Sequence, residues 1–183
     1  MVRLVGIDLA GSPKRPTGIS YVDLPCRTIR TQIVYTDHEI VKITVTPKPK
    51  IVAIDAPLTM PRNGYLREVD RLMHKLGLPV LPPMFPGMRM LAIRGIKLKN
   101  FLNEIGIHVI EVHPRSTLKI LLRKFKLNNL KELIDFLGFF IESKKYLSKD
   151  EQDAVLAMIT AFLYYKGDYC EVKASDGVLI IPR

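Results

Sequence analysis

The sequence predicts an α/β fold, with a mixed sheet flanked by helices, from two observations. Three early β-branched segments follow one another through links too short for a crossover helix, which predicts an antiparallel meander. Two later apolar segments, 51–56 and 108–113, alternate with helical segments, which is the pattern of parallel strands. The chain has 183 residues, enough for one domain (1–183) with a full core.

The first part of the chain predicts four strands and one helix. β-Branched content and turn residues at their ends place strands at 2–10, 19–23, 28–35 and 51–56. Thr36 and Glu39 match a capping box, so we expect a helix that runs to about Val45, although its β-branched residues favour a strand. The segment 11–18 is a turn-rich loop without the Lys-Ser/Thr ending of a phosphate-binding P-loop.

The rest of the chain predicts mainly helices. They are expected at 65–76, 89–105, 116–122 and 129–140, and from a second capping box at Ser148 onward. The proline-rich segment 78–86 is expected to be irregular, 108–113 is a strand, and 178–181 closes the chain as a short strand. The apolar run 154–165 is too short to span a bilayer and predicts a core helix.

Charge and cysteine content limit the class of protein. There are 28 Lys and Arg residues against 18 Asp and Glu, a formal net charge of +10, which favours polyanionic partners such as nucleic acid, nucleotides or a lipid surface. Cys26 and Cys170 lie far apart in the sequence. We expect them to be small buried or half-buried side chains in a reducing compartment and not a disulfide. No signal-peptide pattern precedes Asp8, so a cytoplasmic protein without membrane association is expected.

Carboxylates recur at the ends of the buried strands. Asp8, Asp55 and Glu111 each lie at the end of an apolar segment, and Asp150 and Asp153 open the last helix. Burying several unpaired carboxylates side by side is costly, and a bound divalent cation is the simplest compensation. Acid clusters that bind Mg²⁺ or Mn²⁺ usually process phosphates. The sequence therefore predicts such a site at the carboxyl edge of the sheet, where ligands of parallel sheets bind.

Periodicity predicts which of these side chains share a face. Glu111 and His113 are two apart on a strand, and Asp150 and Asp153 are three apart on a helix, so each pair shares a side. Small side chains next to the helical pair would let the last helix approach the sheet closely; they are Ala154, Ala157 and Ala161.

Each candidate also has an ordinary structural interpretation. Asp8 and Asp55 could cap turns, and Asp150 and Asp153 could be first-turn helix charges. Glu111 could pair with a nearby arginine such as Arg115. His113 could be a core histidine, a ligand or a general base. Arg67 and Asp70 could be a surface pair or could orient a phosphate. Several independent coincidences are needed to explain all the acids in this way.

These residues resemble the predicted ribonuclease H-like nuclease family, long catalogued as a domain of unknown function. The motifs that carry the resemblance are Gly6-Ile7-Asp8, Asp55-Ala56-Pro57, Arg67-x-x-Asp70-Arg71, Pro82-Pro83, Glu111-Val112-His113-Pro114, Asp150-x-x-Asp153 and Asp176-Gly177. The resemblance covers nearly the whole chain, and the order and spacing of these short motifs make it specific. The helix motif is also similar to that of Holliday-junction resolvases.

The resemblance implies a ribonuclease H-like fold, with a five-stranded mixed sheet whose first three strands are antiparallel. It also implies an acid on the first strand (Asp8), one on the fourth (Asp55) and one on the last helix (Asp153). Many members of this fold carry Glu at the fourth-strand position, so Asp55 is a shorter arm.

The hypothesis from the sequence is a nuclease that hydrolyses DNA or RNA with Mg²⁺ or Mn²⁺. Asp8 would bridge two ions, Asp55 and Asp153 would each hold one, and Glu111, Asp150 or His113 would orient the attacking water. Six basic residues are expected to contact phosphates: Lys14, Arg15, Arg67, Arg71, Arg89 and Arg94. A homodimer would suit action on a structured, branched substrate.

Two rival hypotheses remain open. The first is a nucleotide phosphohydrolase or a half-domain of an actin-like ATPase, which shares this core. The second is a catalytically silent nucleic-acid-binding domain in which the acids have little affinity for metal.

Overall fold

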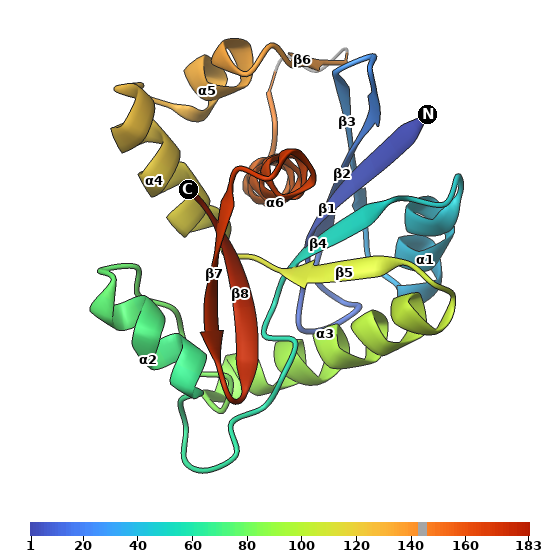
Figure 1. The fold of residues 1–183 in the computed structure, drawn as a ribbon. Coiled ribbons are helices and arrows are strands. Elements are labelled where there is room, and N and C mark those ends of the chain that lie inside the picture. Colours follow the sequence, from blue (N-terminus) through green and yellow to red (C-terminus); the bar gives the residue numbers. More distant parts are fainter. Residues whose placement is uncertain (143–145) are drawn as a thin grey trace.

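A six-stranded mixed sheet forms the centre of the protein in a computed structural model that describes residues 1–142 and 146–183 (Figure 1). Its strand order is β5 (His108–Glu111), β4 (Ile51–Asp55), β1 (Val2–Asp8), β2 (Thr17–Leu24), β3 (Thr28–Val34) and β6 (Phe140–Ile141). Strands β1 to β3 are antiparallel, β4 and β5 run parallel to β1, and β6 runs parallel to β3. The expected meander and parallel strands are confirmed, and β6 is a sixth strand where five were expected.

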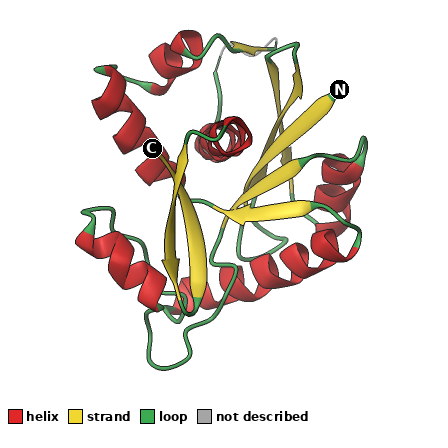
Figure 2. Ribbon diagram, in the orientation of Figure 1, coloured by secondary structure: helices red, strands yellow, loops and turns green. Residues whose placement is uncertain are grey.

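Helices cover both faces of this sheet (Figure 2). One face carries α6 (Lys149–Lys166), which is buried on nearly every side and lies at the centre of the view in Figure 1. Such all-round burial follows from its apolar sequence and confirms the expected core helix. Helices α4 (Pro114–Phe125) and α5 (Leu130–Phe136) pack against it. The opposite face packs against α1 (Asp37–Val45) and α3 (Pro86–Glu104).

Two glycines let α6 lie directly on the sheet. A Cβ at Gly6 of β1 would collide with the backbone of Ala154 and Met158, and a Cβ at Gly18 of β2 would collide with the carbonyl of Asp150. Because Gly18 is the register partner of Asp8, this contact fixes the first turn of α6 beside the end of β1. The close approach expected from the alanines of α6 is therefore confirmed, and the glycines on the sheet make it possible.

A separate hairpin completes the fold. Strand β7 (Tyr169–Ala174) pairs with β8 (Gly177–Pro182), and together with α2 (Glu68–Lys75) they enclose a small core of their own. The turn of this hairpin holds α2, because the Asp176 carboxylate accepts hydrogen bonds from the N–H groups of Glu68 and Val69. The closing strand was expected, but β7 was not, since its residues are mostly exposed and lack an apolar run.

Several expected boundaries need correction. The capping box of Thr36 and Glu39 is present and α1 is confirmed. Helices α3 and α4 begin earlier than expected, because Pro86 and Pro114 occupy their first turns, where a missing N–H costs nothing. The helix expected over 129–140 ends early: Gly138 adopts φ +70°, and β6 follows.

Two other expectations concern the whole chain. Cys26 and Cys170 are free, as expected, but both are exposed rather than buried or half-buried. Among the described residues, no helix is both long enough and apolar enough to cross a membrane.

Candidate functional site

Asp8 and Asp55 lie side by side at the carboxyl edge of the sheet. They are register partners on the parallel strands β1 and β4, so their Cα atoms are about 4.8 Å apart. Strand alternation places both side chains on the face that carries α6, together with Leu4, Ala53 and Gly6. Both acids are half-buried. The predicted convergence of these two acids is therefore present.

The N-terminal part of α6 brings two more carboxylates toward this pair. Ser148 caps the helix by accepting a hydrogen bond from the N–H of Glu151. The Glu151 carboxylate in turn accepts a hydrogen bond of 2.7 Å from the Thr31 hydroxyl of β3. These contacts fix the beginning of α6 above the sheet. Asp150 and Asp153 then face the end of β1 closely enough for both to act electrostatically on Asp8.

Burial and mutual repulsion act on the pKa values of these acids. Burial, and then the negative charges of Asp153 and Asp150, raise the pKa of Asp8 to about 7, although the positive charge of Lys149 lowers it. Burial, followed by Asp8 and Asp153, raises the pKa of Asp55 well above its usual range. Burial also raises the pKa of Asp153. At neutral pH this cluster therefore favours any added positive charge.

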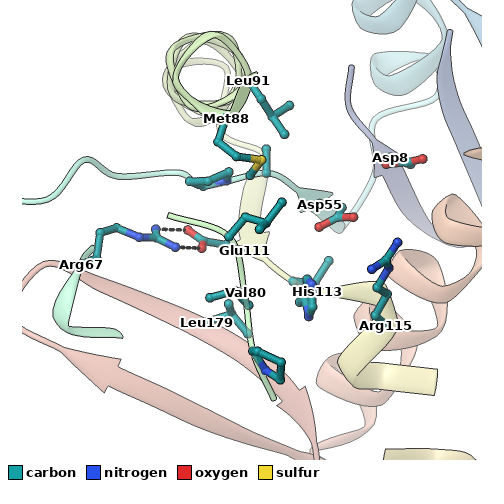
Figure 3. A pocket seen from close by; sticks show the side chains of 15 residues that line it. Asp8, Asp55, Arg67, Val80, Met88, Leu91, Glu111, His113, Arg115 and Leu179 are labelled. Carbon is teal, nitrogen blue, oxygen red and sulfur yellow. Dashed lines mark hydrogen bonds and ion pairs between the residues drawn. The ribbon is translucent and has the colours of Figure 1, made fainter. Parts of the chain in front are cut away.

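Two cations face the cluster, and sequence reasoning gave neither of them this role. Arg115, in the first turn of α4, lowers the pKa of both Asp55 and Asp153, and Lys149 does the same for Asp8 and Asp153. Figure 3 shows the Arg115 side chain pointing toward Asp8 and Asp55. Pro114 at the helix start was the available signal, because it makes α4 begin directly after β5, at this edge of the sheet.

A cleft of about 440 Å³ opens beside Asp8 and Asp55 (Figure 3). Its lining combines charged and apolar side chains. They come from β1, from β4 and the loop after it, from the start of α2, from the segment before α3 and α3 itself, and from β5, α4 and β8. The lining residues are Asp8, Asp55, Ala56, Pro57, Arg67, Pro79, Val80, Leu81, Met88, Leu91, Glu111, Val112, His113, Arg115 and Leu179. Asp150 and Asp153 do not line it, so they act on it from α6 through space.

Glu111 and Arg67 form a buried ion pair in the wall of this cleft. Two parallel bonds of 2.6 and 2.9 Å join them, and Arg67 also binds Asp70 at 2.7 Å and the Thr59 hydroxyl at 3.0 Å. Burial lowers the pKa of Arg67, but its two carboxylate partners outweigh this and the net shift is upward. Burial raises the pKa of Glu111, and the bonds from Arg67 and from the N–H of Leu58 oppose that shift.

This pair corrects two expectations. Arg67 was expected to contact phosphate, but all five of its N–H donors are bound to protein oxygens, so it has none to offer a ligand. Glu111 was weighed as a partner of Arg115, but its partner is Arg67, and the pair Arg67–Asp70 is buried rather than on the surface. The apolar segment correctly predicted Glu111 at the end of a buried strand, but it could not identify the cation.

His113 lies at the start of α4 and lines the cleft. One ring nitrogen, Nδ1, is 2.8 Å from the Ser116 hydroxyl. Burial, with a smaller effect of Arg115, lowers the pKa of His113 to about 4. The ring is therefore neutral at pH 7, able to accept or donate a hydrogen bond without carrying charge.

The other basic residues predicted to contact phosphate divide into two groups. Lys14 and Arg15 on the loop after β1, Arg71 on α2 and Arg89 on α3 are exposed. Arg94 is buried and is a correction: its guanidinium donates 2.7 Å bonds to Asp37 and to the carbonyls of Ala10 and Tyr35. It therefore ties α3 to the end of β1 and to α1 instead of contacting a ligand.

The donor set suits a hard divalent cation, but the ligand shell is incomplete. Within 1–142 and 146–183, no three Asp, Glu, His or Cys side chains are grouped so as to hold a metal by themselves. The expected set of Asp8, Asp55 and Asp153 is thus not assembled as a three-ligand cage. Mg²⁺ in phosphate-processing sites commonly takes one or two carboxylates, with water and substrate phosphate completing the shell. The carboxylates of the register partners Asp8 and Asp55 fit that description.

Solved structures with the same fold exist. A structure described as Thermus thermophilus RuvC has a TM-score of 0.51 and 17% identity, covering 97% of this chain and 100% of the other. A second, T. thermophilus RuvC in complex with Holliday junction substrate, has a TM-score of 0.50 and 17% identity, covering 91% and 97%. No protein-family model and no curated protein matches the sequence. The similarity establishes a ribonuclease H-like fold, which confirms the fold expected from the sequence motifs.

Proposed function

We propose that this protein is a nuclease that hydrolyses phosphodiester bonds with Mg²⁺ or Mn²⁺. The observation that carries the proposal is the pair Asp8–Asp55, held side by side with raised pKa values and with Asp153 nearby on α6. A protein keeps such unneutralised acids in a cleft at a cost in stability, which is typical of a functional site. The net charge of +10 on the chain then favours a polyanionic substrate.

In this proposal Asp8 and Asp55 would hold the ion, and Asp153 would assist them or hold a second one. A bound ion of this kind lowers the pKa of a water and stabilises the leaving oxygen of a phosphodiester. His113, neutral at pH 7, orients the attacking water. Glu111 is less suited to that role because it is bound to Arg67. Arg115 points at the acids and is placed to bind a non-bridging phosphate oxygen.

The exposed basic residues fit a nucleic acid lying over the cleft. Lys14, Arg15, Arg71 and Arg89 would neutralise phosphates without reading sequence. The similarity to a RuvC structure that holds a Holliday junction substrate supports DNA as the substrate class. The match between the two proteins covers 97% of that RuvC chain. The extent of this match favours a nuclease over half of a two-lobed nucleotide hydrolase.

Cleavage assays test the proposal. Wild type, Asp8→Asn and Asp55→Asn are incubated with Mn²⁺ and labelled branched, bulged and linear DNA and RNA. Loss of a ligand to the ion should lower cleavage at least about 100-fold, since outer partners of metal ligands alone are worth 10- to 100-fold. Binding should persist or strengthen in Asp8→Asn, because a negative charge is removed from the phosphate site.

The matched control is Asp135→Asn, which removes an exposed acid from α5 and should cleave like wild type. Equal cleavage by wild type and Asp8→Asn would overturn the mechanism. Thermal stabilisation by ATP with none by any oligonucleotide would favour the nucleotide hydrolase instead.

A further inference from the structure

The cleft continues beyond the acids into an apolar half that the proposed chemistry does not use. Its walls come from the segment before α3, from the first turns of α3 and from β8. We call this region the apolar annex; its residues are Pro79, Val80, Leu81, Met88, Leu91 and Leu179. Figure 3 shows Met88 and Leu91 on one side and Val80 and Leu179 on the other, with Glu111 between them.

The annex has no free charge to offer a phosphate. Arg67 and Glu111 lie in the wall of the same cleft, but they are bound to each other, and the Arg67 donors are all used. Its apolar side chains are in part open to solvent: Leu81 is 60% exposed. Exposed apolar surface in a cleft beside an acid site gains free energy when a flat apolar group covers it.

We propose that the apolar annex binds one unstacked nucleobase of the strand whose phosphate lies at Asp8 and Asp55. This inference rests on the proposed nuclease function and narrows its substrate class. A nucleobase is the apolar part of a nucleotide and is joined to its phosphate through a single sugar, so both ends fit within one cleft of about 440 Å³. The Met88 thioether provides a favourable contact for an aromatic ring.

The arrangement selects against continuous duplex. A base that is paired and stacked cannot enter the annex, and extruding it costs free energy. A bulged, mismatched or single-stranded nucleotide has already lost most of that stacking. The annex therefore favours cleavage beside an unpaired nucleotide and reads the presence of a base rather than its identity, since every base has an apolar face.

Binding measurements with and without the base test this inference. Two DNA duplexes are compared by fluorescence anisotropy with Ca²⁺ in place of Mn²⁺: one has a single bulged adenosine, and the other has an abasic bulge at the same position. Wild type should bind the adenosine bulge about 10-fold more tightly, the usual worth of one base contact. A bulged 2-aminopurine should show the changed fluorescence of a base that leaves the stack for the annex.

Variants of α3 supply the matched pair. Met88→Tyr fills the annex and should abolish the preference for the base, whereas Met90→Tyr, two residues along and 59% exposed, should keep it. Leu81→Ala removes an exposed side chain, should fold like wild type and should reduce the preference. Thermal unfolding of each variant verifies that it is folded.

The outcomes separate the two proposals. Equal affinity of wild type for the base and abasic bulges would overturn the annex assignment, while Mn²⁺-dependent cleavage of either duplex would leave the nuclease proposal intact. Loss of the preference in Met90→Tyr as well as in Met88→Tyr would also overturn it. If free ATP competes as strongly as the bulged duplex, the annex does not bind a nucleic acid strand. If, in addition, no duplex is cleaved, the nuclease proposal is overturned too.

Discussion

Two acid clusters lie at the same cleft: a balanced one, in which both acids are ion-paired with Arg67, and an unbalanced one, in which Asp8 and Asp55 lie next to each other. At the Arg67 end, one guanidinium binds both Asp70 and Glu111, and every donor is used. At the Asp8 end, Asp8 and Asp55 are adjacent, and the nearest cations are exposed residues of α4 and α6.

The contrast separates structural acids from functional acids. A buried carboxylate that has its own guanidinium stabilises the fold only as part of the pair, and it has little left to offer a ligand. A half-buried carboxylate next to another one destabilises the protein without a bound ion, and binding of a cation relieves this repulsion. The Arg67 cluster thus holds the loop after β4, through Leu58 and Thr59, while the Asp8 cluster carries the proposed chemistry.

The largest expected effect on stability comes from removing the cation of the balanced cluster. Arg67→Met leaves Asp70 and Glu111 buried without their cation and should lower the free energy of unfolding by about 3–5 kcal/mol. Urea denaturation measures it. Arg115→Met is the control, because Arg115 is exposed and faces the unbalanced cluster, and it should cost less than about 1 kcal/mol. Similar losses in the two variants would contradict the distinction between the clusters.

A smaller effect of opposite sign is expected at the unbalanced cluster. Asp8→Asn removes one of the repelling charges and should raise the free energy of unfolding by about 1–3 kcal/mol at pH 8 in EDTA. Glu111→Gln is its counterpart in the balanced cluster and should lower the same quantity. A destabilised Asp8→Asn at pH 8 would show that Asp8 has a stabilising partner and would refute the comparison.

The pH dependence of that gain follows from the pKa of Asp8. This pKa is about 7 in the folded protein against an ordinary value of 3.8, so between these values the folded state holds a proton that the unfolded state has released. The contribution of Asp8 to stability therefore falls as pH rises from about 4 to 7. The advantage of Asp8→Asn should be absent near pH 4 and complete above pH 7, as measured by unfolding at a series of pH values.

The smallest effect concerns Asp150. This acid lies in the first turn of α6 and acts on Asp8 only through space. Asp150→Asn loses a favourable helix charge but relieves repulsion of Asp8. The free energy of unfolding should therefore change by less than about 1 kcal/mol, and the cleavage rate by less than about 10-fold. A loss of cleavage as large as that of Asp8→Asn would move Asp150 into the proposed ion shell.

Sequence reasoning located the acids because strand ends and helix caps are local signals. The apolar segments that end in Asp8, Asp55 and Glu111 predicted the edge of the sheet, and the capping box at Ser148 predicted the start of α6. The side on which each acid points followed from alternation. These features depend on spacing along the chain, which the sequence contains.

What the sequence did not reveal depends on contacts between distant segments. The Arg67–Glu111 pair joins residues 44 apart in sequence, and nothing local distinguishes Arg67 from the exposed Arg71. Strand β7 has no apolar run because only its pairing with β8 and packing on α2 define it. The apolar annex likewise combines side chains from three separate segments.

Calorimetric titration of Mn²⁺ tests the central claim most directly, because it needs no knowledge of the substrate. Wild-type protein at pH 7.5 should give a saturable heat of binding that Asp8→Asn abolishes and that the Arg67-side variant Glu111→Gln retains. Equal and negligible heats in wild type and Asp8→Asn would contradict the claim that the unbalanced acids of this cleft hold a divalent cation.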